Sequence, residues 1–77
     1  MKPLGFLAPG EEGVIKEIAG GTGINERLRG MGMTKGKSLR MIQNNACGPV
    51  IVALGETRLA LGRGMALKVL VEEKIIS

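Results

Sequence analysis

Apolar residues along the chain occur mainly in short runs that glycines separate. Several of these runs have the length and the β-branched or aliphatic content of strands, and they cover residues 14–19, 38–44, 50–54, 57–61 and 66–72. In the last run Leu67, Val69 and Val71 fall on alternate positions, which is the period of a half-buried strand. The pattern therefore predicts a protein made mainly of short strands.

The clearest local signal is a hairpin. The runs 50–54 and 57–61 are separated only by Gly55 and Glu56. A two-residue loop with glycine first is typical of a type II′ turn, because that turn needs a positive φ at its first central residue. We therefore expect these two strands to pair.

One segment departs from the strand pattern and has the spacing of an amphipathic helix. Its apolar residues stand at i, i+4 and i+7 and are Ile24, Leu28 and Met31. Thr22 is placed to cap the start of this helix, and Gly30 or Gly32 to end it in a left-handed conformation. A second helical turn is expected at residues 64–66.

These elements predict the fold class. A chain of 77 residues is too short to cover both faces of an open sheet, whereas a sheet that closes on itself hides its edges. Thirteen glycines and a single aromatic residue, Phe6, suit a small barrel, which needs bends and has little room for rings. We expect residues 1–77 to form one mainly β domain, a small SH3-like barrel of about five strands with one short α-helix.

Composition argues against an enzyme. The chain has no His, Asp, Tyr or Trp, so the usual general base and triad residues are missing. Cys47 is the single cysteine and has no cationic neighbour in sequence, which indicates an unreactive turn residue and no thiolate metal site. Met31, Met33 and Met65 are interpreted as packing residues and not as soft metal ligands. We expect no cofactor and no metal.

Two glycine-rich stretches are weak candidates for phosphate binding. Residues 32–38 resemble a P-loop but are one residue too short, and a strand is predicted where the helix should follow. Residues 20–23 cannot complete a dinucleotide-binding pattern, because Glu26 stands where the last glycine is needed. Both stretches are interpreted as turns.

The net charge of +4 is concentrated in one place. The basic residues around the helix and its exit are Arg27, Arg29, Lys35, Lys37 and Arg40. Such a patch can contact nucleic acid, an anionic membrane or an acidic protein, and it can also be an ordinary solvated face. Nucleic acid is disfavoured because the only aromatic residue, Phe6, is far from the patch in sequence.

Three segments together resemble the FeoA family of ferrous-iron transport proteins. They are RLRGMGMTKG at residues 27–36, GPV at 48–50 and ALGRGMA at 60–66, within a similarity that spans residues 4–73. The order and spacing of the three carry the resemblance. The chain departs from the family pattern at Met33, Lys35, Gly62 and Gly64, which puts the loop after the helix in doubt.

The resemblance implies the same SH3-like barrel, related to the C-terminal domain of metal-dependent repressors. It also implies a cytoplasmic, bacterial-type, non-catalytic accessory protein of Fe(II) uptake. Its partner would be a membrane GTPase permease of the FeoB type, which would recruit it to the inner face of the plasma membrane. The start of the chain is too short and proline-broken for a signal peptide, and no apolar run approaches the length of a membrane span, which fits this expectation.

The hypothesis for partner binding is a surface with an apolar centre and a basic rim. Its residues are Arg27, Leu28, Arg29, Met31, Met33 and Lys35. The competing interpretation is that Leu28 and Met31 face the core. Weak self-association through strand edges or methionines is a further possibility. The alternative function is a small basic barrel that binds nucleic acid, although no stable complex is expected.

Overall fold

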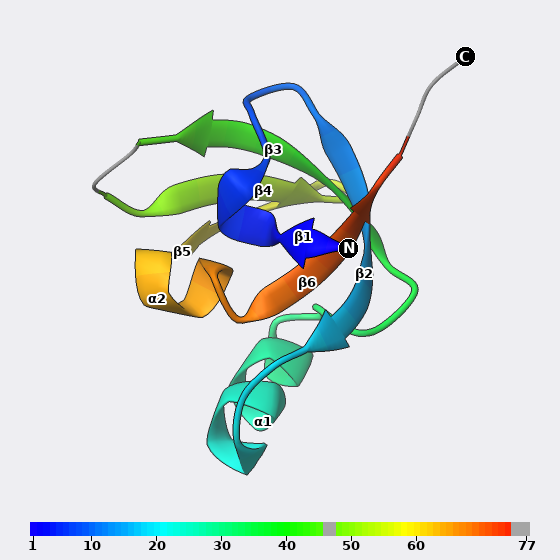
Figure 1. The fold of residues 1–77 in the computed structure, drawn as a ribbon, viewed down its shortest axis with the longest axis vertical. Coiled ribbons are helices and arrows are strands. Elements are labelled where there is room, and N and C mark those ends of the chain that lie inside the picture. The colour runs from blue at the N-terminus through cyan, green and yellow to red at the C-terminus, as the bar shows by residue number, and fades with distance from the viewer. Residues whose placement is uncertain (46–47, 75–77) are drawn as a thin grey trace.

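The computed structural model describes residues 1–45 and 48–74, and over these ranges the chain forms a curled antiparallel sheet with short helices (Figure 1). In chain order the elements are β1 (Lys2–Pro3), the 3-10 helix η1 (Leu4–Phe6), β2 (Glu12–Ile18), α1 (Thr22–Gly30), β3 (Ser38–Asn44), β4 (Val50–Leu54), β5 (Thr57–Leu61), α2 (Arg63–Ala66) and β6 (Val69–Glu73). The predicted mainly β fold with one longer helix is therefore confirmed. Cys47 lies outside the described residues.

The sheet contains six strands in the order β1-β6-β2-β3-β4-β5. The predicted hairpin is its most regular part: Leu54 pairs with Thr57, and Gly55 has φ 65°. A positive φ at the first loop residue, and none at Glu56, is the φ pattern of a type II′ turn. The bounds predicted for β3, β4 and β5 are also those of the structure.

The last strand begins later than the sequence predicted. Ala66 belongs to α2, and Leu67 follows it at the end of the helix with 40% of its surface exposed. The alternation of apolar residues had placed Leu67 on the buried face with Val69 and Val71, and for Leu67 this was wrong. The backbone of Leu67 has φ −76° and ψ −14°, which is helical and breaks the two-residue period.

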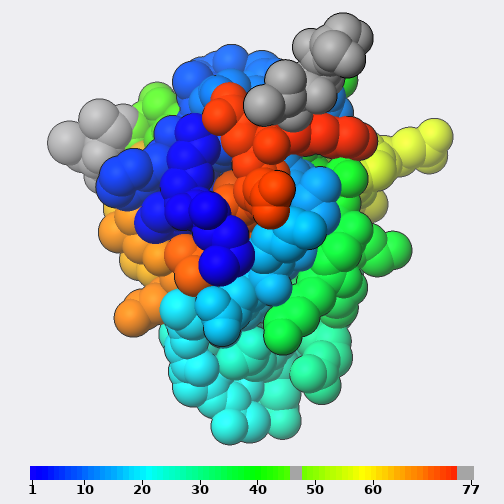
Figure 2. All heavy atoms as spheres, turned by 45° about the vertical axis from the view of Figure 1, so that its right-hand side comes forward, coloured from blue at the N-terminus to red at the C-terminus, as the bar shows by residue number. Residues whose placement is uncertain are grey.

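β6 lies inside the sheet, between β1 and β2, although it is the last element of the chain. Figure 2 shows the N-terminal residues, in blue, packed against the orange and red residues of β6. The two-residue strand β1 is at one end of the sheet and β5 is at the other. In the described ranges no strand pairing joins these two ends, so the sheet curls without closing by backbone hydrogen bonds.

α1 projects at one end of the molecule (Figures 1 and 2). The helix ends in a Schellman motif. The Met33 amide donates to the Leu28 carbonyl (2.9 Å) and the Gly32 amide to the Arg29 carbonyl (3.0 Å). Gly32 has φ 84°, the left-handed conformation that this motif requires. Of the two glycines predicted to end the helix, Gly32 is therefore the one that does so.

The start of α1 differs from the prediction. Gly21 is the N-cap residue, in an extended conformation with no side-chain cap, and Thr22 is already helical. The Asn25 side-chain amide donates to the carbonyls of Gly20 (3.2 Å) and Gly21 (3.1 Å). The capping role expected for Thr22 was thus wrong, because the helix begins at Thr22 itself and Gly21 occupies the cap position.

The core is entirely apolar. Its fully or almost fully buried side chains come from every part of the chain and are Leu4, Leu7, Ile15, Leu28, Met33, Leu39, Met41, Val50, Val52, Leu61, Ala66, Val69 and Val71. Phe6 is absent from this set, so the only aromatic ring of the chain lies outside the core. The absence of rings fits a small barrel whose interior is filled by aliphatic and methionine side chains.

Candidate partner-binding surface

Two of the residues predicted to form an apolar contact surface lie in the core. Leu28 and Met33 are both 0% exposed. They are residues C3 and C″ of the Schellman motif, and an apolar contact between these two positions commonly accompanies it. Leu28 and Met33 are therefore removed from the candidate surface, and the interpretation that Leu28 faces the core is the correct one.

The remaining predicted residues lie at the surface around the end of α1 and the loop that follows. Arg27, Arg29 and Lys35 are exposed, and Met31 is half-buried against the core. We call Arg27, Arg29, Lys35 and the exposed Lys37 the basic end. In the described residues none of these four side chains forms an ion pair.

Arg40, which the sequence grouped with the basic end, belongs to another surface. Its Nη2 atom lies 3.8 Å from Oε1 of Glu12 on the neighbouring strand β2. Arg40 on the sheet is therefore partly neutralised, whereas the residues of the basic end form no ion pair in the described part of the chain. The sequence could not separate them, because the turn at Gly36 and the start of β3 carry Arg40 away from the helix.

A hollow of about 370 Å³ adjoins the basic end. It lies where the end of β2, the side of α1 and the following loop meet, and its lining is Glu17, Ile18, Asn25, Arg29, Met33, Thr34 and Lys35. The half-buried Ile18 supplies apolar surface, Arg29 and Lys35 supply positive charge, and Glu17 supplies one negative charge. This arrangement can receive a side chain that has an apolar stem and a carboxylate.

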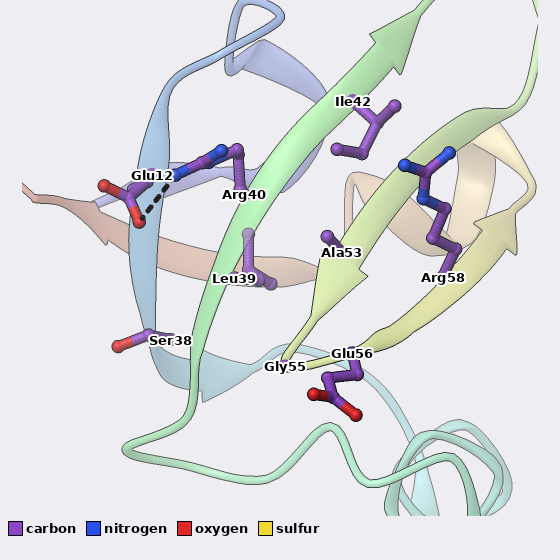
Figure 3. A pocket seen from close by; sticks show the side chains of 9 residues that line it. All are labelled: Glu12, Ser38, Leu39, Arg40, Ile42, Ala53, Gly55, Glu56 and Arg58. Carbon is purple, nitrogen blue, oxygen red and sulfur yellow. Dashed lines mark ion pairs between the residues drawn. The ribbon is translucent and has the colours of Figure 1, made fainter.

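A second groove, of about 480 Å³, lies on the outer face of β3, β4 and β5 (Figure 3). Ile42 and Ala53 occupy its middle, with Arg40 and Arg58 on opposite sides. Glu12 pairs with Arg40 and Glu56 lies at the hairpin turn, so the charges of this groove balance. No sequence pattern predicts this groove, since its residues are spread over four strands and a turn.

The most connected polar side chain is Arg63, at the first position of α2. Its guanidinium donates to Gly5 O (3.1 Å), Gly48 O (3.2 Å), Asn44 Oδ1 (2.6 Å) and the Asn45 carbonyl. It thereby links η1, the end of β3 and the β3–β4 loop. We call this set of hydrogen bonds the Arg63 clasp.

Asn44 completes the clasp from the end of β3. Its side-chain amide donates to Gly5 O (2.9 Å) and Leu7 O (2.7 Å). Arg63 and Asn44 thus connect segments at the two ends of the sheet that no strand pairing joins. Sequence analysis had noted Arg63 only as part of a family motif and had assigned it no role.

Two carboxylates and a lysine gather near the start of β2 and the end of β6. A hydrogen bond to Glu73 and another from the Ala8 amide (2.5 Å) lower the pKa of Glu11. The hydrogen bond and negative charge of Glu11 raise the pKa of Glu73, although Lys2 lies 3.7 Å from it. Because Glu73 is exposed and Glu11 is only half-buried, this pair adjusts local charge and does not create a buried acid.

Comparison with known proteins identifies the family. The model of the FeoA domain matches residues 2–73. The chain belongs to the FeoA family. A curated relative from Methanocaldococcus jannaschii, named as an Fe(2+) transport protein A, is 42% identical over 73 residues, which are 95% of this chain and 88% of the relative. The family resemblance predicted from the three motifs is therefore confirmed.

Solved FeoA structures share the fold. The crystal structure of an iron uptake regulatory protein (FeoA) is 33% identical, with a TM-score of 0.89 over 94% of this chain and 96% of the other. FeoA from Stenotrophomonas maltophilia, described as a procaryotic SH3 domain protein, is 28% identical, with a TM-score of 0.81 over 94% and 91% of the two chains. The SH3-like class is thus confirmed.

The predicted relation to metal-dependent repressors also holds at the level of fold. A manganese-dependent transcriptional repressor matches with a TM-score of 0.87 and 19% identity, over 95% of this chain and 41% of the repressor. This likeness concerns architecture alone.

The S. maltophilia FeoA was solved in complex with zinc. In this FeoA chain, residues 1–45 and 48–74 contain no group of three or more His, Cys, Asp or Glu side chains that could hold a metal ion. No helix in the same ranges is both long and apolar enough to cross a bilayer.

Proposed function

We propose that this FeoA-family chain is a non-catalytic accessory protein of Fe(II) uptake that binds the cytosolic part of a membrane GTPase permease of the FeoB type. Membership of a family whose 42% identical relative is named as an Fe(2+) transport protein supports the transport role. The observation that carries the binding role is the basic end, where four exposed cations have no ion pair in the described part of the chain.

The charge of the basic end favours an acidic partner. The last turn of α1 contains Arg27 and Arg29, and the loop adds Lys35 and Lys37. Glu26 lies in α1 itself and Glu17 at the end of β2, but the four cations leave this end of the molecule net positive. Cations that form no ion pair within residues 1–45 and 48–74 are available to carboxylates of another protein, and such pairs raise the association rate and select the partner.

The hollow beside α1 is the place where we expect this contact to form. Arg29 and Lys35 line it together with the apolar Ile18. A carboxylate that enters the hollow would meet two cations against the single carboxylate of Glu17 and would be partly withdrawn from water, which strengthens the net attraction. We propose that the permease places a Glu or Asp side chain there and thereby holds this chain peripherally at the cytosolic side of the membrane.

The test is co-purification of the full chain with the permease in detergent, followed by measurement of Kd. The double variant Arg29→Glu, Lys35→Glu should weaken binding by about 100-fold or more, since two attractive contacts become repulsive. Arg58→Glu is the matched control, because Arg58 is an exposed arginine in the other groove. Equal weakening by the control would show a general effect of charge and would remove the basic end from the interface.

Two further results would decide against the proposal. A parent chain that does not bind the permease at low salt would exclude direct contact. Steep, salt-sensitive binding to random oligonucleotides would favour the nucleic-acid alternative instead. The structure offers this alternative no stacking platform at the basic end, because the single aromatic residue is in η1 and not in α1 or its loop.

A further inference from the structure

The only aromatic side chain of the protein is on the surface. Phe6 is 66% exposed, in a chain that buries thirteen other apolar residues almost completely. Leaving an aromatic ring in water forgoes the free energy of burying it, which is about 1.5–3 kcal/mol for a large apolar side chain. A ring in this position does not contribute to the core, so its surroundings indicate what else it can do.

The residues on either side of Phe6 are held rigidly. Leu4, Gly5 and Leu7 are buried. The Gly5 carbonyl accepts from Arg63 and Asn44, and the Leu7 carbonyl accepts from Asn44. The Arg63 clasp therefore fixes the backbone before and after Phe6, while the ring itself points outward. A rigidly presented ring loses little conformational entropy when a partner covers it.

A second exposed apolar residue comes from the neighbouring helix. Leu67 is 40% exposed and directly follows α2, which packs against η1. A Cβ atom added to Gly5 would lie 3.3 Å from Cδ2 of Leu67. Leu67 is thus next to the residue that precedes Phe6. Phe6 and Leu67 together are called the η1–α2 patch.

Basic residues predominate in the two segments that carry this patch, although Glu73 of β6 lies 3.7 Å from Lys2. The segments 1–10 and 57–71, which carry Phe6 and Leu67, contain no Asp or Glu but include the exposed Lys68 beside Leu67. The acid nearest in sequence to Phe6 is Glu11, whose carboxylate is held by the Ala8 amide. An apolar centre with cations at its edge matches an apolar pocket bordered by carboxylates.

We infer that the η1–α2 patch is an anchor that inserts the Phe6 ring into an apolar, acid-rimmed pocket on the protein partner. This inference rests on the proposed function and adds to it a second contact, separate from the basic end. An aromatic residue presented from a fixed backbone is the kind of residue that dominates the energy of protein interfaces. Leu28 and Met33 were predicted to form the apolar centre of the partner-binding surface, but they are buried. Phe6 and Leu67 supply an exposed apolar contact in their place.

Other occupants fit the patch less well. A second copy of the chain related by two-fold symmetry would bring Lys68 of each copy toward the same interface, and like charges there oppose association. A lipid bilayer would gain only one ring and part of one leucine, and even a full acyl chain gives only marginal membrane binding. Dimerisation and membrane binding are therefore treated as alternative outcomes of the test below.

The test compares the affinity of variants for the purified cytosolic domain of the permease. Phe6→Ala should raise Kd by at least tenfold, and Leu67→Ala by a smaller factor. The matched control is Ile42→Ala, which shortens an apolar side chain in the groove of Figure 3 and should leave Kd within about twofold. Circular dichroism melts verify that each variant is folded.

A conservative variant supplies an independent readout. The chain has no Trp and no Tyr, so Phe6→Trp would contain a single fluorophore. It should bind with nearly the parent affinity, and its emission should shift to shorter wavelength when the permease domain is added. Unchanged emission at saturating partner would show that the ring stays in water and would overturn the inference.

The outcomes separate the two proposals. If the parent binds the domain and Phe6→Ala binds equally well, the anchor is wrong while the accessory role stands. If the parent does not bind at all, the accessory role fails and the anchor fails with it. Phe6-dependent dimerisation in analytical ultracentrifugation, or Phe6-dependent flotation with vesicles containing 30% anionic lipid, would replace the protein pocket by a second copy or by a membrane.

Discussion

The two α-helices of the protein are attached to the sheet by opposite means. α1 has nine residues and is held by apolar side chains: Leu28 and Met33 are buried, and Ile24 and Met31 pack against them in part. α2 has four residues and is held by the hydrogen bonds of Arg63, with Ala66 as its buried apolar residue. The longer helix therefore depends on the hydrophobic effect and the shorter one on polar contacts.

This difference divides the molecule into two functional ends. Around α1 the four cations of the basic end form no ion pair in the described residues, whereas around α2 the Arg63 side chain is used to close the fold. What remains for a partner beside α2 is mainly apolar, in Phe6 and Leu67, with the exposed Lys68 at its edge. The proposed interface thus draws charge from one end and apolar surface from the other.

The largest effect is expected where α1 meets the core. Met33→Glu would place a carboxylate at a fully buried position in the apolar core, and should lower the free energy of unfolding by about 4 kcal/mol or more. Met31→Glu, at a half-buried position, should cost clearly less. Urea denaturation followed by far-UV circular dichroism measures both. Equal losses for the two variants would mean that the burial of Met33 has been overestimated.

The next largest effect tests the polar attachment of α2. Arg63→Ala would leave the carbonyls of Gly5, Gly48 and Asn45 without this donor and should cost about 2–4 kcal/mol of unfolding free energy. Arg63→Lys should recover only a small part, because an ammonium cannot reproduce the planar fork of donors. Arg58→Ala is the exposed control and should change stability by no more than about 0.5 kcal/mol. A harmless Arg63→Ala would show that the clasp does not hold the ends of the sheet.

A pair of glycines at the end of α1 gives smaller effects of opposite sign. Gly32→Ala should lower the free energy of unfolding by about 1 kcal/mol, since φ 84° is unfavourable for any residue with a Cβ. Gly30→Ala should raise it by about 0.5 kcal/mol, because Gly30 is helical and an added Cβ would meet nothing within 4 Å. The difference between the urea midpoints of the two variants measures how much stability depends on a glycine at the left-handed position of the Schellman motif. Two shifts of the same sign would contradict the assignment of Gly32.

The smallest effect belongs to the exposed carboxylates near β6. Glu11→Gln should lower the pKa of Glu73 toward its ordinary value, because Glu11 is the main cause that raises it. An NMR titration of the side-chain carboxyl carbons measures this directly, with Glu56→Gln as a control that leaves Glu73 unchanged. A pKa of Glu73 that stays raised in Glu11→Gln would show that another group causes the shift.

The same pair predicts little net dependence of stability on pH in the acid range. The lowered pKa of Glu11 contributes stability that is present above its unfolded pKa and is lost as the pH falls through the folded value. The raised pKa of Glu73 contributes stability that is present below its unfolded pKa and is lost as the pH rises through the folded value. These slopes have opposite signs and partly cancel around the ordinary pKa of a glutamate.

The sequence predicted those parts of the structure that local periodicity determines. The β4–β5 hairpin followed from Gly55 and two short apolar runs, and α1 followed from the spacing of Ile24, Leu28 and Met31. The same periodicity misplaced Leu67, because a short helix between two strands continues an alternating pattern by chance. Thr22 was misplaced for a similar reason, since the change to helical backbone at Gly21 leaves no mark in the sequence.

The candidate surface was harder to predict, because exposure depends on contacts between distant residues. Met33 was expected at the surface as part of a loop, and only the Schellman motif turns it into the core. Arg63 could not be given a role because its acceptors lie 15 to 58 positions away in the chain. Phe6 was recorded as a compositional oddity, and its exposure became visible only when Leu4 and Leu7 were seen to be buried on either side of it.

The position of β6 has a consequence for how the protein is made. Because β6 lies between β1 and β2, the first two strands have no common neighbour until residues 69–73 have left the ribosome. Until then the N-terminal strands expose apolar faces, while the β3–β4–β5 meander can pair locally. We expect the fold to be completed only once β6 has emerged, when this strand is inserted into a partly formed sheet.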